Sequence, residues 1–145
     1  MNNTVDAIIE KKFFILEVNK TNRNFRKYTD EVINSWIDNM DGYGYEVEFG
    51  VGMKPSDIQY EFIKSELVCG LVTKLTLEEG ILYGTVKFST ESFKSEEIYS
   101  GKIDLGECVI VPKGKSEVRD GVVQKNYILY GFNLVHKSQS SFHFE

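Results

Sequence analysis

The change in hydrophobic period around Gly42 constrains the fold of this chain more than any other feature. Before Gly42, apolar residues recur at the spacing of one helix face, and Thr29 precedes them as a candidate N-cap. After Gly42, apolar residues alternate strictly with glycines and glutamates from Tyr43 to Met53, which predicts a half-buried strand. We therefore expect a helix that ends at Gly42 and a strand directly after it. The helical stripe consists of Val32, Ile33, Trp36, Ile37 and Met40.

Further apolar runs separated by turn sequences predict a mainly antiparallel sheet. Glu78-Glu79-Gly80 and Asp120-Gly121 are sequences that close β-hairpins. A short helix is expected within 89–100 and a loop within 19–28. With about six or seven strands and two helices, we predict an α+β fold, a small β-barrel or curled sheet with two peripheral helices. Residues 1–145 are expected to form a single domain, with strands near 8–18, 67–77, 82–88, 108–111 and 127–136.

The charge balance limits the kinds of partner. The chain has 17 Lys and Arg against 22 Asp and Glu, a net charge of -5, which disfavours general nucleic-acid binding. No apolar run approaches the length of a membrane span, and residues 1–6 do not resemble a secretion signal. The segment from Lys20 to Lys27 has four basic residues and no acidic one. It is either a solvated loop or a small patch for an acidic partner.

Cysteine and histidine give no metal or cofactor signature. Cys69 and Cys108 lie in apolar runs, which predicts buried, reduced thiols in a reducing cytoplasm. Their spacing to His136 and His143 matches no zinc motif, so we expect no metal and no cofactor. The serines near the two histidines leave a Ser-His hydrolase as an alternative. These serines are Ser138, Ser140 and Ser141.

Two other charged segments are expected to be exposed. Glu46 and Glu48 share one face of the predicted strand 43–53, and their alternation with apolar residues indicates a solvated face. Lys113-Gly114-Lys115 is expected to be an exposed turn after Pro112, which should interrupt the strand.

One string in the predicted loop is specific enough to indicate a family. Asn22-Arg23-Asn24-Phe25-Arg26-Lys27-Tyr28 follows a strand and precedes a helix, with the pattern Asn-Arg-Asn-x-Arg-x-Tyr. This pattern resembles the prohead (capsid maturation) serine proteases of tailed phages, in particular T4-like phages. Segments 82–87, 103–114 and 130–135 follow in the order of the family's later elements. The resemblance covers residues 13–141 in outline and implies a prohead-protease-like fold.

The chain departs from the family at both catalytic positions. The family's histidine would fall within 44–50, and no histidine is present there. The family's serine pair would fall within 110–114, where Lys113-Gly114 keeps only the Arg-Gly character that the family uses near the oxyanion. A serine nucleophile needs a base within reach, so the family's mechanism cannot run at these positions. We expect a pseudoenzyme.

The resemblance therefore implies a protein that binds other proteins. The binding candidates are Arg23, Arg26, Tyr28, Lys113 and Gly114. Expected partners are a phage capsid or core protein or a host protein, with self-association into homo-oligomers and no membrane contact. The expected location is the cytoplasm of the bacterial host or the virion. An active hydrolase with a relocated site and a structural virion component remain alternatives.

The resemblance also raises the question of proteolytic processing. T4-like prohead proteases cut after Leu/Ile-x-Glu, and Ile8-Ile9-Glu10 fits this pattern, as does Ile15-Leu16-Glu17. Cleavage after the first triplet would make the protein a capsid-internal substrate.

Overall fold

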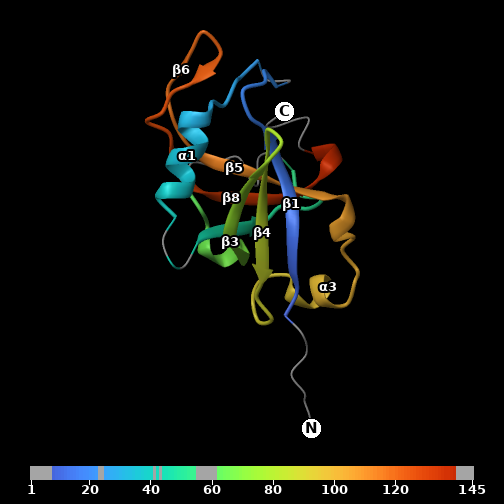
Figure 1. Cartoon of the computed structure of the whole chain (residues 1–145). Helices are drawn as coiled ribbons and strands as arrows, with labels where there is room; N and C mark the ends of the chain where they lie inside the picture. The colour runs from blue at the N-terminus through green and yellow to red at the C-terminus, as the bar shows by residue number, and fades with distance from the viewer. Residues whose placement is uncertain (1–7, 23–24, 41, 43, 55–61, 140–145) are drawn as a thin grey trace.

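The computed structural model describes residues 8–22, 25–40, 42, 44–54 and 62–139, and its centre is a curled sheet with helices outside it (Figure 1). The helices are α1 (Asp30–Asp38) and α3 (Ser95–Tyr99), with 3-10 turns η1 (Ser65–Leu67) and η2 (Leu105–Glu107). The strands are β1 (Glu10–Glu17), β2 (Tyr45–Phe49), β3 (Val68–Glu78), β4 (Ile81–Phe88), β5 (Cys108–Lys115), β6 (Val118–Arg119), β7 (Val122–Val123) and β8 (Ile128–His136).

The sheet topology explains the curled shape. Within the described residues, six strands are hydrogen-bonded in the order β1-β4-β3-β2-β8-β5, and β6 and β7 form a separate ribbon. The two edge strands, β1 and β5, contact one another, so the sheet curls into a half barrel. This arrangement confirms the predicted α+β class with a curled, mainly antiparallel sheet. One pairing is parallel, between β2 and β8, and it places the strand after α1 beside the last strand.

Both hairpins predicted from turn residues are present. β3 and β4 are joined at Glu79 and Gly80, which have φ values of 51° and 80°. β6 and β7 are joined at Asp120 and Gly121, with φ values of 50° and 78°. Glycine adopts this left-handed conformation without steric cost, which is why these short sequences predict the turns well.

One continuous apolar core lies between the sheet and α1. The apolar stripe of α1 is buried at Val32, Ile33 and Trp36, as the helical spacing predicts. The hydroxyl of Tyr45 donates to the Trp36 carbonyl at 2.8 Å and ties the helix to the start of β2. At the other end of the molecule, the Tyr99 hydroxyl of α3 donates to the Phe88 carbonyl at 2.7 Å.

Three predicted boundaries are wrong. α1 ends at Asp38 with Asn39 as C-cap, before the predicted stop at Gly42. β2 is shorter than the predicted strand 43–53, because the chain leaves the sheet after Phe49; Tyr43 lies outside the described residues. β5 continues through Pro112, because β5 is an edge strand and one side of its backbone needs no partner. None of the described helices is long and apolar enough to cross a bilayer.

Candidate functional site

The sheet face that points away from the main core carries a buried ion pair. Lys113 on β5 and Glu48 on β2 are 6% and 0% exposed, and Nζ of the lysine lies 2.7 Å from Oε1 of the glutamate. The other carboxylate oxygen of Glu48 accepts a hydrogen bond from the backbone N–H of Lys64. The ammonium of Lys113 also donates to the Phe62 carbonyl at 3.3 Å. Protein partners therefore replace the water that both charges have lost.

The chain that connects β2 to β3 helps to cover this face. Met53 packs against Val111 and Val135, which form a small apolar cluster, and it also contacts the main core. Gly131 gives Ile63 the space to lie on the sheet, because a Cβ at position 131 would be 2.8 Å from the Ile63 Cδ1 atom. The cover explains how a charged pair on the outer sheet face is buried.

Gln139, after the end of β8, holds the first part of this connection. Its side-chain amide nitrogen donates to the carbonyls of Gly50 and Met53 at 2.9 and 3.2 Å. Its amide oxygen accepts from the backbone N–H of Gly52 at 3.0 Å and of His136 at 2.8 Å. One side chain therefore fixes four backbone groups, and the sequence carries no signal for this role.

The electrostatics of the pair favour a structural role. Burial lowers the pKa of the Lys113 ammonium, and the hydrogen bond and charge of Glu48 act in the opposite direction. Removing one member of such a pair leaves an uncompensated buried charge. Glu48 is fully buried and Lys113 is nearly so, and both are engaged by protein partners, so the pair offers no free acid, base or nucleophile.

Two predictions about exposure are wrong at this site. The sequence predicts Glu46 and Glu48 on a solvated face, but only Glu46 is exposed. Lys113-Gly114-Lys115 is predicted as an exposed turn, but these residues form the end of β5 and Lys113 is buried. Strand alternation assigns a residue to a face and gives no information about a distant segment that covers that face.

Asn133 on β8 lies between the two charged strands and was not predicted as a site residue. The sheet register places it opposite Glu48 on β2 and opposite Val111 on β5. The side chain is fully buried, and within the described residues neither amide atom has a hydrogen-bond partner. An unpartnered buried amide costs about 1–3 kcal/mol. The only sequence signal is one polar residue within an apolar strand.

The described residues of the string, Asn22 and 25–28, are joined by local hydrogen bonds and are called the turn below. The Asn22 side-chain oxygen accepts from the Arg26 N–H at 3.1 Å, and the Asn22 N–H donates to the Arg26 carbonyl at 2.8 Å. The turn is joined to the β6–β7 ribbon, because the Lys27 N–H donates to the Gly121 carbonyl at 2.7 Å. Arg23, one of the predicted binding residues, lies outside the described residues.

Two other predicted residues, Tyr28 and Gly114, meet at one aromatic ring. The Tyr28 ring lies 5.7 Å from Trp36 and 6.1 Å from Tyr127, measured between ring centroids. Gly114 lies directly beside Tyr127, since a Cβ at position 114 would be 2.9 Å from the Cζ atom of that ring. Burial raises the pKa of Tyr127, and the positive charge of Arg26 opposes this shift. Lys113, the neighbour of Gly114, points to the opposite face.

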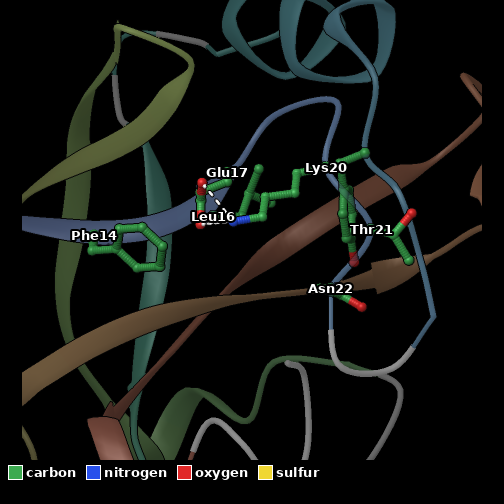
Figure 2. Close-up of a pocket in the computed structure, with 7 residues that line it drawn as sticks. Phe14, Leu16, Glu17, Lys20, Thr21 and Asn22 are labelled. Atoms are coloured by element: carbon green, nitrogen blue, oxygen red, sulfur yellow. Dashed lines mark hydrogen bonds and ion pairs between the residues drawn. The ribbon is translucent and has the colours of Figure 1, made fainter.

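A cavity of about 300 Å³ lies between β1 and the turn (Figure 2). At its edge, Nζ of Lys20 lies 3.2 Å from a carboxylate oxygen of Glu17, and both side chains are largely exposed. The cavity therefore combines apolar walls with a charged rim. Its lining residues are Phe14, Leu16, Glu17, Lys20, Thr21, Asn22 and Tyr28.

The surroundings of the two cysteines make their thiols unreactive. Cys69 and Cys108 are free and buried. Burial raises the pKa of Cys69 to about 12 and that of Cys108 to about 11, so both thiols stay protonated at neutral pH. Among the described residues, no cluster of three or more His, Cys, Asp or Glu side chains is placed to hold a metal ion.

The histidine and serine after β8 are in contact. Nδ1 of His136 lies 2.8 Å from the Ser138 hydroxyl oxygen. The backbone N–H of Ser138 donates to the same nitrogen at 3.1 Å. Residues 137–139 are helical, so this pattern is a helix N-cap in which one imidazole nitrogen accepts from the residue two positions later. Ser140, Ser141 and His143 lie outside the described residues.

The structure is similar to that of the bacteriophage T4 capsid assembly protease, gp21. The two chains align with a TM-score of 0.59 and 15% sequence identity, over 90% of this chain and 91% of the protease chain. This likeness supports the predicted prohead-protease-like fold, and at such low identity it establishes the fold alone. No family model and no curated protein matches the sequence.

Proposed function

We propose that this chain is a non-catalytic phage protein with a prohead-protease-like fold, and that it acts by binding other proteins. The observation that carries the proposal is the Lys113–Glu48 pair, with 2.7 Å between the ammonium and the carboxylate. The resemblance assigns the family's histidine to segment 44–50 and its serine to segment 110–114. In this chain the two segments meet, and they contribute charges that neutralise each other.

The chemistry of the pair supports the loss of catalysis. A serine protease needs a hydroxyl within hydrogen-bond reach of a base that can accept its proton. Both carboxylate oxygens of Glu48 already accept hydrogen bonds from protein donors. The ammonium of Lys113 is directed at Glu48 and at the Phe62 carbonyl, so it is not presented to a substrate oxyanion.

The partner is a phage capsid or core protein or a host protein. Because the chain's net charge is -5, we expect a partner whose surface is basic overall. The site of action would be the cytoplasm of the infected bacterium or the assembling virion.

A relocated serine hydrolase is the second candidate, and the contact between His136 and Ser138 favours it. A serine hydroxyl 2.8 Å from an imidazole nitrogen has the distance that nucleophile activation requires. However, the same nitrogen also accepts the Ser138 backbone N–H, and a side chain that accepts this N–H at the start of the helical residues 137–139 is typical of a helix N-cap. We therefore favour the binding protein.

Processing after Ile8-Ile9-Glu10 is not part of the proposal, because the backbone around this triplet is engaged. The Phe88 N–H donates to the Ile9 carbonyl at 3.0 Å, and Glu10 is paired with Lys87 in the sheet. The second triplet, 15–17, lies inside β1. A protease needs an extended, accessible segment, so we expect the folded protein to resist cleavage at both.

The direct test is an affinity pull-down with the tagged protein from bacteria infected with a T4-like phage and from uninfected bacteria. A tagged, unrelated acidic domain of similar size is the control for charge-driven background. We expect one protein at near-stoichiometric yield: a capsid or core protein only after infection, or a host protein in both lysates. Recovery of no protein above the control, or of cleaved fragments only, would contradict the proposal.

A further inference from the structure

The side chain of Phe25 contributes little to the stability of the fold. Its side chain is 80% exposed, so its apolar surface stays in water. Its φ is +60°, in the left-handed region that is unfavourable for bulky side chains. Asparagine or glycine would adopt this conformation more easily. Two unfavourable features at one residue indicate that Phe25 has a role other than stabilising the fold.

The other left-handed positions show the contrast. Phe25 is the single aromatic residue among the described non-glycine residues with positive φ. The remaining ones are all polar: Asn19, Glu79, Lys94 and Asp120.

Phe25 adjoins the cavity beside the turn. Its backbone N–H donates to the Asn22 carbonyl at 3.0 Å, and Asn22 lines the cavity of about 300 Å³. Leu16 and Tyr28 supply apolar parts of the cavity wall. Phe25 does not itself line the cavity, so a partner would have to cover the exposed phenyl ring and the cavity beside it together. The cavity has room for one large apolar side chain.

Basic side chains lie beside this cavity, although its own edge carries the opposite charges of Lys20 and Glu17 and the whole protein is acidic. Arg26 is exposed next to Phe25, and Lys27 and Lys20 lie on either side along the chain. Segment 20–27 contains no acidic residue. Lys20 is paired with Glu17 in an exposed ion pair, which contributes little and can be exchanged for an acid of the partner. The charge therefore fits an acidic ligand.

We propose that Phe25, Arg26 and the adjoining cavity form a docking surface for an acidic polypeptide segment, which inserts one apolar side chain beside Phe25. The inference rests on the proposed function as a protein-binding protein and identifies the surface and the chemistry of its partner. Exposed aromatic and arginine side chains are the groups that most often dominate such interfaces. The cavity takes the apolar side chain, and the basic side chains of Arg26 and Lys27 select its acidic neighbours.

Fluorescence anisotropy with synthetic peptides tests the surface. The probe is a fluorescein-labelled peptide with one central leucine flanked by glutamates. Two matched peptides replace the glutamates by lysines or the leucine by alanine. We expect the acidic leucine peptide to bind at least about tenfold more tightly than either, because each replacement removes one of the two complementary features. Equal binding of the acidic and basic peptides would overturn the proposal, as would no binding of any of them.

Variants locate the binding. Phe25→Asn and Arg26→Glu should each weaken binding of the acidic leucine peptide at least about tenfold. Ile128→Asn is the matched control, because Ile128 is also an exposed apolar residue, at 58%, and lies on β8. The control variant should bind as the wild type does. Unchanged binding by Phe25→Asn, or equal loss in the control, would overturn the proposal.

Thermal unfolding of Phe25→Asn shows whether Phe25 is structural. We expect a midpoint no lower than that of the wild type, and a clearly lower midpoint would overturn the proposal. The pull-down repeated with Phe25→Asn separates the two proposals. If the wild type captures a partner and the variant captures it equally well, the docking surface is wrong and the protein-binding function stands. If the wild type captures nothing, the proposed function itself fails.

Discussion

Two regions of this molecule depart from the usual distribution of polar and apolar groups, in opposite directions. On the outer face of the sheet, the charged Glu48 and Lys113 are buried, at 0% and 6% exposure. In the turn before α1, the apolar Phe25 is 80% exposed. The buried charges have partners within the chain, at 2.7 Å and through backbone groups. The side chain of Phe25 remains largely in solvent.

This difference suggests how to tell residues that stabilise the fold from residues that bind a partner. An unusual residue that other parts of the same chain compensate contributes to the fold, and its replacement should change stability. An unusual residue that is exposed and that nothing in the chain compensates should contribute little to stability, and its replacement should change binding. On this comparison we assign the Glu48–Lys113 pair to folding and propose that the Phe25 turn acts in recognition. The following substitutions test this assignment, from the largest expected effect to the smallest.

Breaking the buried pair should have the largest effect on stability. Lys113→Met leaves the Glu48 carboxylate buried with its ion-pair partner removed, and we expect a loss of about 3–5 kcal/mol in the free energy of unfolding. The double variant Glu48→Leu with Lys113→Met removes both charges and should recover most of this loss. Urea unfolding followed by circular dichroism measures both. If the single variant is as stable as the wild type, the pair is not structural.

Filling the space beside Tyr127 should have a smaller effect. Gly114→Ala places a methyl group against the Tyr127 ring and the Ile128 carbonyl, and overpacking of this kind costs about 1–3 kcal/mol. The variant should also perturb Tyr28, whose ring packs against Tyr127. Denaturant unfolding and near-UV circular dichroism report the two effects. Gly106→Ala is the control, because a Cβ there would approach only the Asp104 side chain.

Replacing Asn133 should raise stability, whereas the two substitutions above should lower it. Neither amide atom of Asn133 is partnered within the described residues, so Asn133→Leu removes an unsatisfied polar group while it keeps the number and branching of the side-chain heavy atoms. We expect a gain of about 1 kcal/mol, the lower end of the cost of such a group. Thermal and urea unfolding measure it. A loss of stability would mean that the amide binds water or another group that the apolar variant cannot bind.

The smallest effect is expected at the turn. Phe25→Asn should leave the free energy of unfolding unchanged or raise it by about 0.5–1 kcal/mol, because asparagine tolerates a φ of +60° better. Urea unfolding of this variant beside Lys113→Met gives the comparison in one experiment. A loss at Phe25 similar to the loss at Lys113 would remove the distinction between the two regions.

Much of the fold was predictable because its signals are local. Helical spacing identified α1, and Glu79-Gly80 and Asp120-Gly121 identified both hairpins, since each depends on a few adjacent residues. The site was less predictable because it depends on distant segments. The burial of Glu48 requires the parallel pairing of β2 with β8 and a covering connection, and neither leaves a periodic signal. Of the predicted site residues, Tyr28 and Gly114 meet at Tyr127, while Lys113 faces elsewhere.

Intact-mass spectrometry after treatment with a fluorophosphonate probe tests the central claim most directly, that a protease-like fold here carries no serine hydrolase chemistry. The folded wild-type protein should keep its mass, because Glu48 and Lys113 are paired with each other and the contact of His136 with Ser138 is a helix N-cap. A stoichiometric adduct that Ser138→Ala abolishes would contradict the account and establish an active serine at the end of β8.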